Sequence, residues 1–148
     1  MVIAGLGFLA GILWLDLIFD VQILRHAQSG TKAHEDALAL MSTYYRHATG
    51  GARPMDLLIA VMMLVTLAAI IKELIGGGDW VTWSTLIAAG GPIVLAGTHT
   101  VPSAVKLGAT PREASVERRR LARTILREHV MALAGIVTAL TLQLAFAS

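Results

Sequence analysis

Hydrophobic residues in this chain gather into four long runs that are separated by polar segments. A bilayer core about 30 Å thick is crossed by roughly 20 apolar helical residues, and each run is close to that length. The runs cover residues 2–24, 55–71, 80–98 and 130–147. We therefore predict an all-α integral membrane four-helix bundle that forms a single domain over residues 1–148. No basic segment precedes the first run and no small-residue cleavage site interrupts it, which favours a retained span over a signal peptide.

The spacing of apolar residues changes between the first two runs. Over residues 31–47 they recur every three or four positions, which is typical of one face of a helix. The apolar positions are Ala37, Leu38, Met41, Tyr44 and Tyr45, and the polar positions opposite them are His34, Glu35 and Asp36. We predict a short amphipathic helix on the cytoplasmic side, because this segment is too charged to cross a bilayer.

The fourth helix is predicted to begin well before its apolar run. Thr110-Pro111-Arg112-Glu113 matches a capping box with proline at the first helical position. A helix from Pro111 to Phe146 would be about 54 Å long and would protrude from the bilayer into the cytoplasm. On the protruding part, Leu121 and Ile125 share a face that could pack against the amphipathic helix.

The third run contains a possible irregularity in its backbone. Gly90-Gly91-Pro92 lies midway along this run, and proline removes one helical hydrogen bond and crowds the preceding turn. We predict a kink that frees backbone carbonyls for a ligand or for the neighbouring Thr98 hydroxyl.

Composition supports the membrane assignment. Hydrophobic residues make up 55% of the chain and charged residues only 15%, against about 45–50% and about 25% in soluble domains. So apolar a chain must bury its surface in protein or lipid, which excludes a disordered protein. The chain has no cysteine. This excludes a disulfide framework, thiolate metal sites, iron–sulfur clusters and thiol nucleophiles.

Basic residues predict the orientation of the spans. Eleven of the twelve lysines and arginines fall in the first and last connections, and only Lys72 lies beside the turn at residues 75–79. Since basic residues are retained on the cytoplasmic side, we expect a multi-pass protein of the bacterial inner membrane with both termini outside the cytoplasm. Arg119, Arg123 and Arg127 form a stripe that could bind anionic lipid headgroups or an acidic partner. Nucleic acid is not an expected partner, because aromatic residues do not alternate with these charges.

Two aspartates lie inside the first span. Asp16 and Asp20 are about 5 Å and about 10 Å from the centre of that span, at 1.5 Å per residue. An ionised carboxylate at this depth costs several kcal/mol unless it meets water or a partner, so such residues are candidates for function. The two lie on one helical face, where they could share a proton, bind a cation or accept hydrogen bonds. Alternatively, they are protonated or hydrogen-bonded acids that hold the bundle together.

The opposite face of the same helix carries two glycines. Gly7 and Gly11 form a GxxxG step, which allows the backbones of two membrane helices to approach closely. This face is therefore a candidate contact, either within the bundle or with a second copy in a homo-oligomer.

Four histidines are predicted near one membrane boundary. They are His26, His47, His99 and His129. Together with Asp20, Asp56, Tyr44 and Glu128 they could form a metal, haem or redox site, because neutral imidazole is a common ligand of metal ions and haem. The alternative is an ordinary interfacial location, with His99 and His129 as the exceptions because they are closest to the spans. No Glu-x-x-His pair of the di-iron type occurs on any span.

The last third of the chain resembles a known family. Val101-Pro102, Lys106-Leu107-Gly108 and the run at residues 123–129 are similar to segments of the anthrone-oxygenase-like family of small four-span membrane proteins. The resemblance implies a cofactor-poor oxygenase or a relative of one, with Arg127 and His129 as candidate site residues.

Taken alone, the residues favour a polar pocket near the cytoplasmic face of the bundle. The pocket residues would be Asp16, Asp20, His99, Glu128 and His129, with Arg127 nearby. It would bind a metal ion, haem or a small lipophilic ligand, with or without redox chemistry. The alternatives are a non-catalytic accessory or scaffold subunit of a membrane complex, and a proton or cation pathway. No nucleophile with an adjacent base, phosphate loop or zinc motif is present, so the sequence leaves open whether the protein is an enzyme.

Overall fold

The computed structural model describes residues 1–26, 32–48, 54–111 and 114–146, and these residues contain helices and no strands. The elements are α1 (Val2–His26), α2 (Lys32–Ala48), α3 (Pro54–Ile75), α4 (Trp80–Thr85), η1 (Leu86–Gly90), α5 (Gly91–Leu95), η2 (Ala96–Thr100), α6 (Val101–Ala109) and α7 (Ser115–Phe146). The segments from α4 to α6 follow one another without a break and form one long helix. The predicted all-α class is confirmed.

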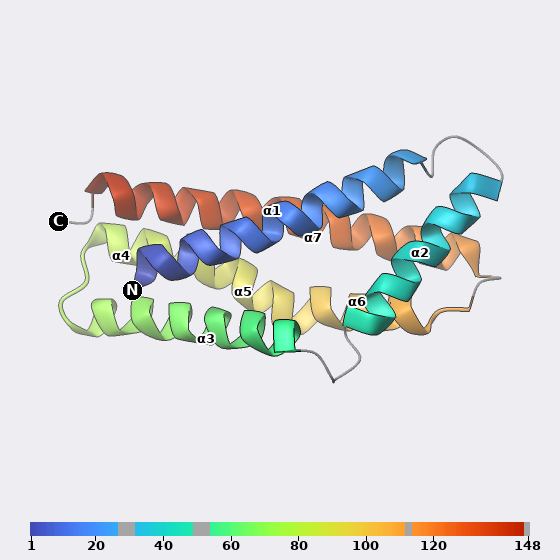
Figure 1. Ribbon diagram of the computed structural model, residues 1–148. Helices are drawn as coiled ribbons and strands as arrows, with labels where there is room; N and C mark the ends of the chain where they lie inside the picture. The colour runs from blue at the N-terminus through green and yellow to red at the C-terminus, as the bar shows by residue number, and fades with distance from the viewer. Residues whose placement is uncertain (27–31, 49–53, 112–113, 147–148) are drawn as a thin grey trace.

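Four helices are long and apolar enough to cross a membrane, as predicted. The candidate spans are Val2–Val21, Leu57–Ile75, Trp80–Ala109 and Val116–Phe146. Figure 1 shows that both termini and the turn between α3 and α4 lie at one end of the bundle, whereas α2 lies at the other end. We call these the terminal end and the α2 end.

The third long helix corrects the predicted boundary at residue 98. It continues to Ala109 through two π-helical segments, η1 and η2, each of which directly precedes a segment containing a proline. The ring of a proline crowds a carbonyl group in the preceding turn of a helix. For Pro92 and Pro102, that preceding turn is the π-helical segment. A wider turn at that point lets the helix continue. Thr98 Oγ1 donates to Val94 O at 2.7 Å within the same helix.

Two other boundaries also differ from the prediction. α3 ends at Ile75, four residues after the predicted end of the second span. α7 begins at Ser115 instead of Pro111. Thr110 Oγ1 donates to Lys106 O at 2.6 Å, within the last turn of α6, and is five residues before the start of α7. At 32 residues, α7 is about 48 Å long, as expected for a helix longer than the bilayer. The amphipathic helix is confirmed as α2 (Lys32–Ala48), and Thr31 lies outside the described residues. Residues 112–113 of the predicted capping box also lie outside them.

The interior consists of two apolar clusters, one towards each end. At the α2 end, Leu38 and Met41 of α2 pack with Leu107 of α6 and with Leu121 and Ile125 of α7, which confirms the predicted contact of these last two residues. Towards the terminal end, the cluster is formed by residues of α1, α3, η1, α5 and α7. It contains Val2, Leu6, Leu9, Ile70, Ala89, Ile93, Ile136 and Ala139. On α7, Glu128 and His129 lie between the two clusters; together with Asp20 of α1 they form what we call the polar layer.

Glycine positions show which helices approach most closely. A Cβ at Gly135 of α7 would collide with Ala88 O and the Pro92 ring, and one at Gly5 of α1 would collide with Thr66 Oγ1 of α3. By contrast, Gly7 and Gly11 are exposed, and a Cβ at either would meet nothing within 4 Å. The GxxxG step therefore makes no close contact within the chain, and α1 approaches α3 at Gly5 instead.

The turn into α4 begins with a capping aspartate. Asp79 Oδ1 accepts hydrogen bonds from the Thr82 backbone N–H at 2.9 Å and from Thr82 Oγ1 at 3.1 Å. These contacts satisfy a backbone donor that the first turn of the helix leaves without a partner. In the same turn, Gly77 has a φ of 109°, which favours glycine.

Candidate functional site

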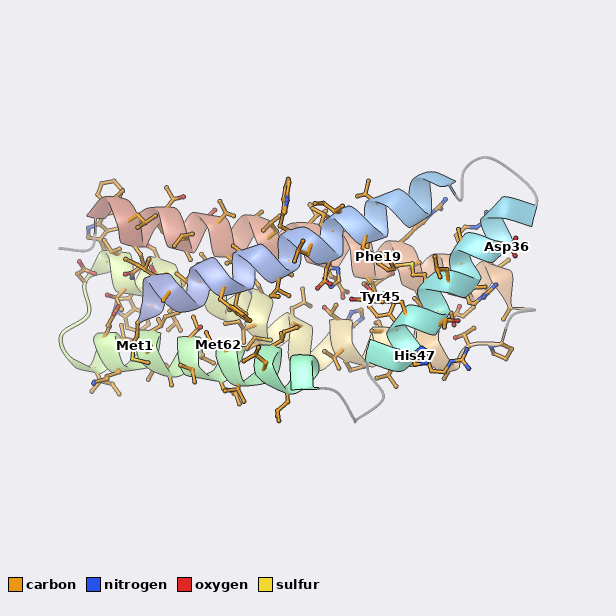
Figure 2. All side chains as sticks on the ribbon, viewed as in Figure 1. Met1, Phe19, Asp36, Tyr45, His47 and Met62 are labelled. Carbon is orange, nitrogen blue, oxygen red and sulfur yellow. The ribbon has the colours of Figure 1, made fainter. Side chains whose placement is uncertain are left out.

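The centre of the candidate site is the carboxylate of Asp20 on α1. Asp20 is 0% exposed. Its Oδ1 accepts a hydrogen bond from Tyr45 Oη of α2 at 3.0 Å, and its Oδ2 accepts one from His129 Nδ1 of α7 at 2.8 Å. In Figure 2, Tyr45 lies on the side of α2 that faces α1. Helices α1, α2 and α7 therefore meet at one buried carboxyl group.

A second acid–histidine pair lies next to the first along α7. His99 Nδ1, from η2, contacts Glu128 Oε1 at 2.5 Å. The Glu128 side chain is 4% exposed and that of His99 is 56% exposed, so the pair extends from the interior to the surface. The other oxygen, Glu128 Oε2, is buried and has no hydrogen-bond partner among the described atoms.

Helical geometry explains how α7 serves both pairs. Successive side chains on an α-helix point about 100° apart. Glu128 therefore faces the third long helix while His129 faces α1. This divergence prevents the adjacent residues from sharing one ligand.

Asp16 has a different partner from Asp20. Tyr44 Oη donates to Asp16 Oδ1 at 3.5 Å, and the Tyr44 ring packs on Phe19 with 4.5 Å between ring centres. Two consecutive tyrosines of α2 thus face two aspartates that are one helical turn apart on α1. The aspartates lie on one face, as predicted.

The electrostatics of the site favour a protonated tyrosine. Burial of the Tyr45 ring, and secondarily the nearby charge of Asp20, raise the pKa of the Tyr45 hydroxyl above its ordinary value. The hydroxyl therefore keeps its proton at neutral pH and remains a hydrogen-bond donor. Together with His129, it offsets part of the cost of burying the Asp20 carboxylate.

Several residues proposed from the sequence lie elsewhere. His47 is exposed near the end of α2 (Figure 2), and its Nδ1 contacts Thr43 O at 2.8 Å in its own helix. The His26 side chain lies outside the described residues. Arg119, Arg123 and Arg127 are exposed on α7, so Arg127 does not join the buried cluster. In the part of the chain whose side chains are described, no three histidine, aspartate or glutamate residues come together as a potential metal site.

Two functional candidates were missed by the sequence argument. Tyr45 was assigned to the apolar face of the amphipathic helix, and its ring is indeed buried there. The signal was the hydroxyl itself, since a tyrosine buried beside a span with acidic residues requires a hydrogen-bond partner. The other is Arg118, which is 1% exposed although it lies in a run of three arginines.

Comparison of this chain with protein-family models, curated proteins and solved structures finds no match. By the length and composition of its four apolar helices, the chain has the character of a multi-pass membrane protein. The resemblance to the anthrone-oxygenase-like family stays a prediction.

Proposed function

We propose that this protein is a proton pathway of the bacterial inner membrane, with Asp20 as its central proton-binding group. The observation that carries the proposal is the fully buried Asp20 carboxylate, which is hydrogen-bonded to both Tyr45 and His129. In this proposal the α2 end faces the cytoplasm and both termini lie outside it.

The surface of the bundle supports contact with lipid. Only 11% to 33% of the residues in the candidate spans are buried within the chain. Large apolar side chains such as Trp14, Leu64, Ile87 and Val94 are exposed along the helices. An aqueous surface rarely presents so much apolar area, whereas hydrocarbon accommodates it.

The chemistry of the buried triad supports proton binding. Imidazole gains or loses a proton near neutral pH more readily than other side chains, and the His129 ring lies against a buried carboxyl group. Asp20 and His129 share a hydrogen bond along which a proton can pass from one to the other. Tyr45 keeps its own proton and donates to either state of Asp20, so it stabilises the position of the carboxyl group.

The second pair supplies a route between the surface and this triad. His99 is half exposed and contacts buried Glu128, which is adjacent to His129 on α7. Glu128 Oε2 has no described partner, and since Glu128 and His129 point about 100° apart, the proposal requires a water molecule to carry the proton between the second pair and the triad. At the terminal end, the buried polar contact between Gln143 Nε2 and Thr85 Oγ1 offers hydrogen bonds but no titratable group.

The test is proton flux into liposomes that contain the full-length protein. A potassium gradient with valinomycin drives protons inward, and a pH-sensitive dye trapped inside reports them. Asp20→Asn should lose most of the flux, whereas Asp36→Asn, at an exposed position of α2, should conduct like the original protein. Circular dichroism verifies that both variants are folded. Unchanged flux in folded Asp20→Asn would refute the proposal. Flux through the original protein no higher than in protein-free liposomes would also refute it.

A second candidate function is binding of a small lipophilic molecule at His99. The observation that favours it is the exposed imidazole held by a buried carboxylate, which can donate a hydrogen bond to a carbonyl group arriving from the lipid. A short-chain quinone should quench tryptophan fluorescence of the detergent-purified protein at saturating concentration. His99→Gln should weaken this binding and His47→Gln should not. Equal binding by both variants would exclude His99 as the site.

A further inference from the structure

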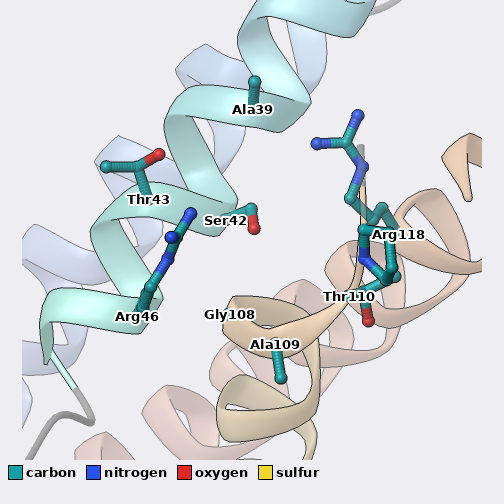
Figure 3. Close-up of a pocket in the computed structure, with 9 residues that line it drawn as sticks. Ala39, Ser42, Thr43, Arg46, Gly108, Ala109, Thr110 and Arg118 are labelled. Carbon is teal, nitrogen blue, oxygen red and sulfur yellow. The ribbon is translucent and has the colours of Figure 1, made fainter. Parts of the chain in front are cut away.

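A small polar pocket lies at the α2 end, and its lining residues do not include Asp20, Glu128 or their hydrogen-bond partners. Its volume is about 170 Å³, many times the roughly 10–15 Å³ that a single water molecule requires. The residues that line the pocket include Ser42, Thr43 and Arg46 of α2, Gly108 of α6, Thr110, and Arg118 of α7. Figure 3 shows Arg118 extending from α7 towards α2, across the pocket from Arg46.

Arg118 is the unusual residue of this pocket. It is 1% exposed, and its Nε and Nη1 atoms are buried without a hydrogen-bond partner among the described atoms. A buried guanidinium without an acceptor is destabilising, and proteins normally satisfy such groups. The described lining residues include two arginines and no carboxylate. The pocket therefore presents positive charge and free N–H donors to whatever enters it.

The other polar groups of the pocket are largely engaged. Ser42 Oγ donates to Leu107 O at 3.0 Å and Thr110 Oγ1 donates to Lys106 O, so their protons serve the protein itself. Gly108 fixes the distance between α2 and α6, since a Cβ there would lie 2.8 Å from Arg46 Cα. Close packing at Gly108 and the engaged hydroxyls therefore leave the two arginines as the main groups that the pocket offers to a ligand.

We propose that this pocket binds a phosphate-type anion between Arg46 and Arg118. Guanidinium groups match phosphate oxygens in shape and charge through paired N–H donors. Two facing cations suit a group that carries up to two negative charges better than a single carboxylate. The anion is either free phosphate or a phosphate ester in a lipid headgroup, and both have the same recognition chemistry.

The experiment measures the unfolding temperature of the full-length protein in a neutral detergent while inorganic phosphate is added. A ligand that binds only the folded state raises this temperature with concentration. Parallel samples at equal ionic strength contain acetate, and others contain mixed micelles of phosphatidylglycerol or phosphatidylcholine. A saturable rise with phosphate identifies a free-anion site. A rise with phosphatidylglycerol alone identifies a headgroup site. No rise with either, or an equal rise with acetate, overturns the proposal.

Three variants separate this binding from general charge effects. Arg118→Met should abolish the ligand effect and raise the unfolding temperature without ligand, because it removes a buried unpaired charge at similar volume. A purely structural Arg118 predicts the opposite, a fall without ligand. Arg120→Gln removes one exposed positive charge from the same helix and should keep the full effect. If Arg118→Met does not fold, Arg46→Gln decides the matter: the proposal requires a several-fold weaker apparent affinity, and an unchanged affinity refutes it.

Discussion

His129 and Asp20 are 109 positions apart in the chain, and their side chains meet at 2.8 Å between α7 and α1. The contact joins the two helices that flank the polar layer, and the third partner, Tyr45, comes from a helix outside the four long ones. The position of α2 is thus linked to the state of a carboxyl group inside the bundle.

Removing the Tyr45 hydroxyl should destabilise the protein. Tyr45→Phe leaves Asp20 Oδ1 without this donor, so we expect a loss of about 1–3 kcal/mol in unfolding free energy, as for other buried hydrogen bonds to charged groups. Thermal or denaturant unfolding in detergent measures it. Tyr44→Phe is the matched control, because its hydroxyl contact with Asp16 is longer and more exposed, and it should cost less. The reverse order would mean that Tyr45 is not essential to the polar layer.

Stability at alkaline pH should depend on the same hydroxyl. Burial raises the pKa of Tyr45 above the ordinary value of 10.0, so the folded protein keeps a proton that the unfolded chain releases. The resulting stability is fully present below pH 10 and is lost as the pH rises above it. Unfolding temperatures measured across this range should fall more steeply for the original protein than for Tyr45→Phe. Parallel curves would contradict the assignment.

Asp79 should have the opposite dependence on pH. Hydrogen bonds from the Thr82 backbone N–H, and then from its hydroxyl, lower the pKa of Asp79 below the ordinary value of 3.8. Its contribution to stability is therefore present above that value and disappears as the pH falls through the lowered pKa. Asp79→Asn keeps a capping side chain but should lose part of the acid sensitivity of unfolding. An acid profile identical to that of the original protein would show that the cap carries no charge-dependent stability.

Close packing at Gly135 should make α7 intolerant of a methyl group. Gly135→Ala would push against Ala88 O and Pro92, and we expect a loss of about 1–3 kcal/mol, typical of overpacking. Gly97→Ala provides the comparison, since a Cβ there meets nothing within 4 Å. This variant should be neutral or slightly stabilising, because alanine is the better helix former. Unfolding free energies of both variants decide the point.

The predicted orientation can be tested because the chain has no cysteine. Gly76→Cys places a thiol in the turn at the terminal end, and Arg120→Cys places one at an exposed position near the α2 end. In intact cells whose outer barrier is permeable, a membrane-impermeant maleimide should label the first and not the second. Opening the inner membrane should then allow labelling of both. The inverse pattern would place both termini in the cytoplasm.

Sequence periodicity predicted the elements of this fold better than their ends. The apolar spacing at residues 31–47 identified α2 within a residue or two, because amphipathic order is a local property. The end of the third helix was missed because the apolar run stops near residue 98. Pro92 indicated a kink, whereas a π-helical turn depends on backbone geometry that residue identity does not encode. Thr110 does not cap α7, because that helix begins five residues later, at Ser115, and the Thr110 side chain points back to Lys106 O of α6.

The candidate site was predicted in its acids and histidines but not in its pairing. Asp16 and Asp20 could be identified from the sequence, because a charge inside an apolar span has a high free-energy cost however the helix packs. The choice of partner depends on rotation and register between helices, which a single sequence does not specify. For that reason the pairing of Glu128 with His99, and of Asp20 with His129, emerged only from the structure.

The two π-helical segments change the rotational phase of the helix that contains them. A π-helical turn contains about one residue more than an α-helical turn, and one residue corresponds to about 100° around the axis. The two halves of this helix therefore present differently phased faces, with Ala89 and Ile93 in one apolar cluster and Leu107 in the other. His99 lies within the second phase shift. Deleting one residue of η2 would leave the composition almost unchanged. It would nevertheless rotate Leu107 and Gly108 away from α2 and disrupt the packing of α6 against α2.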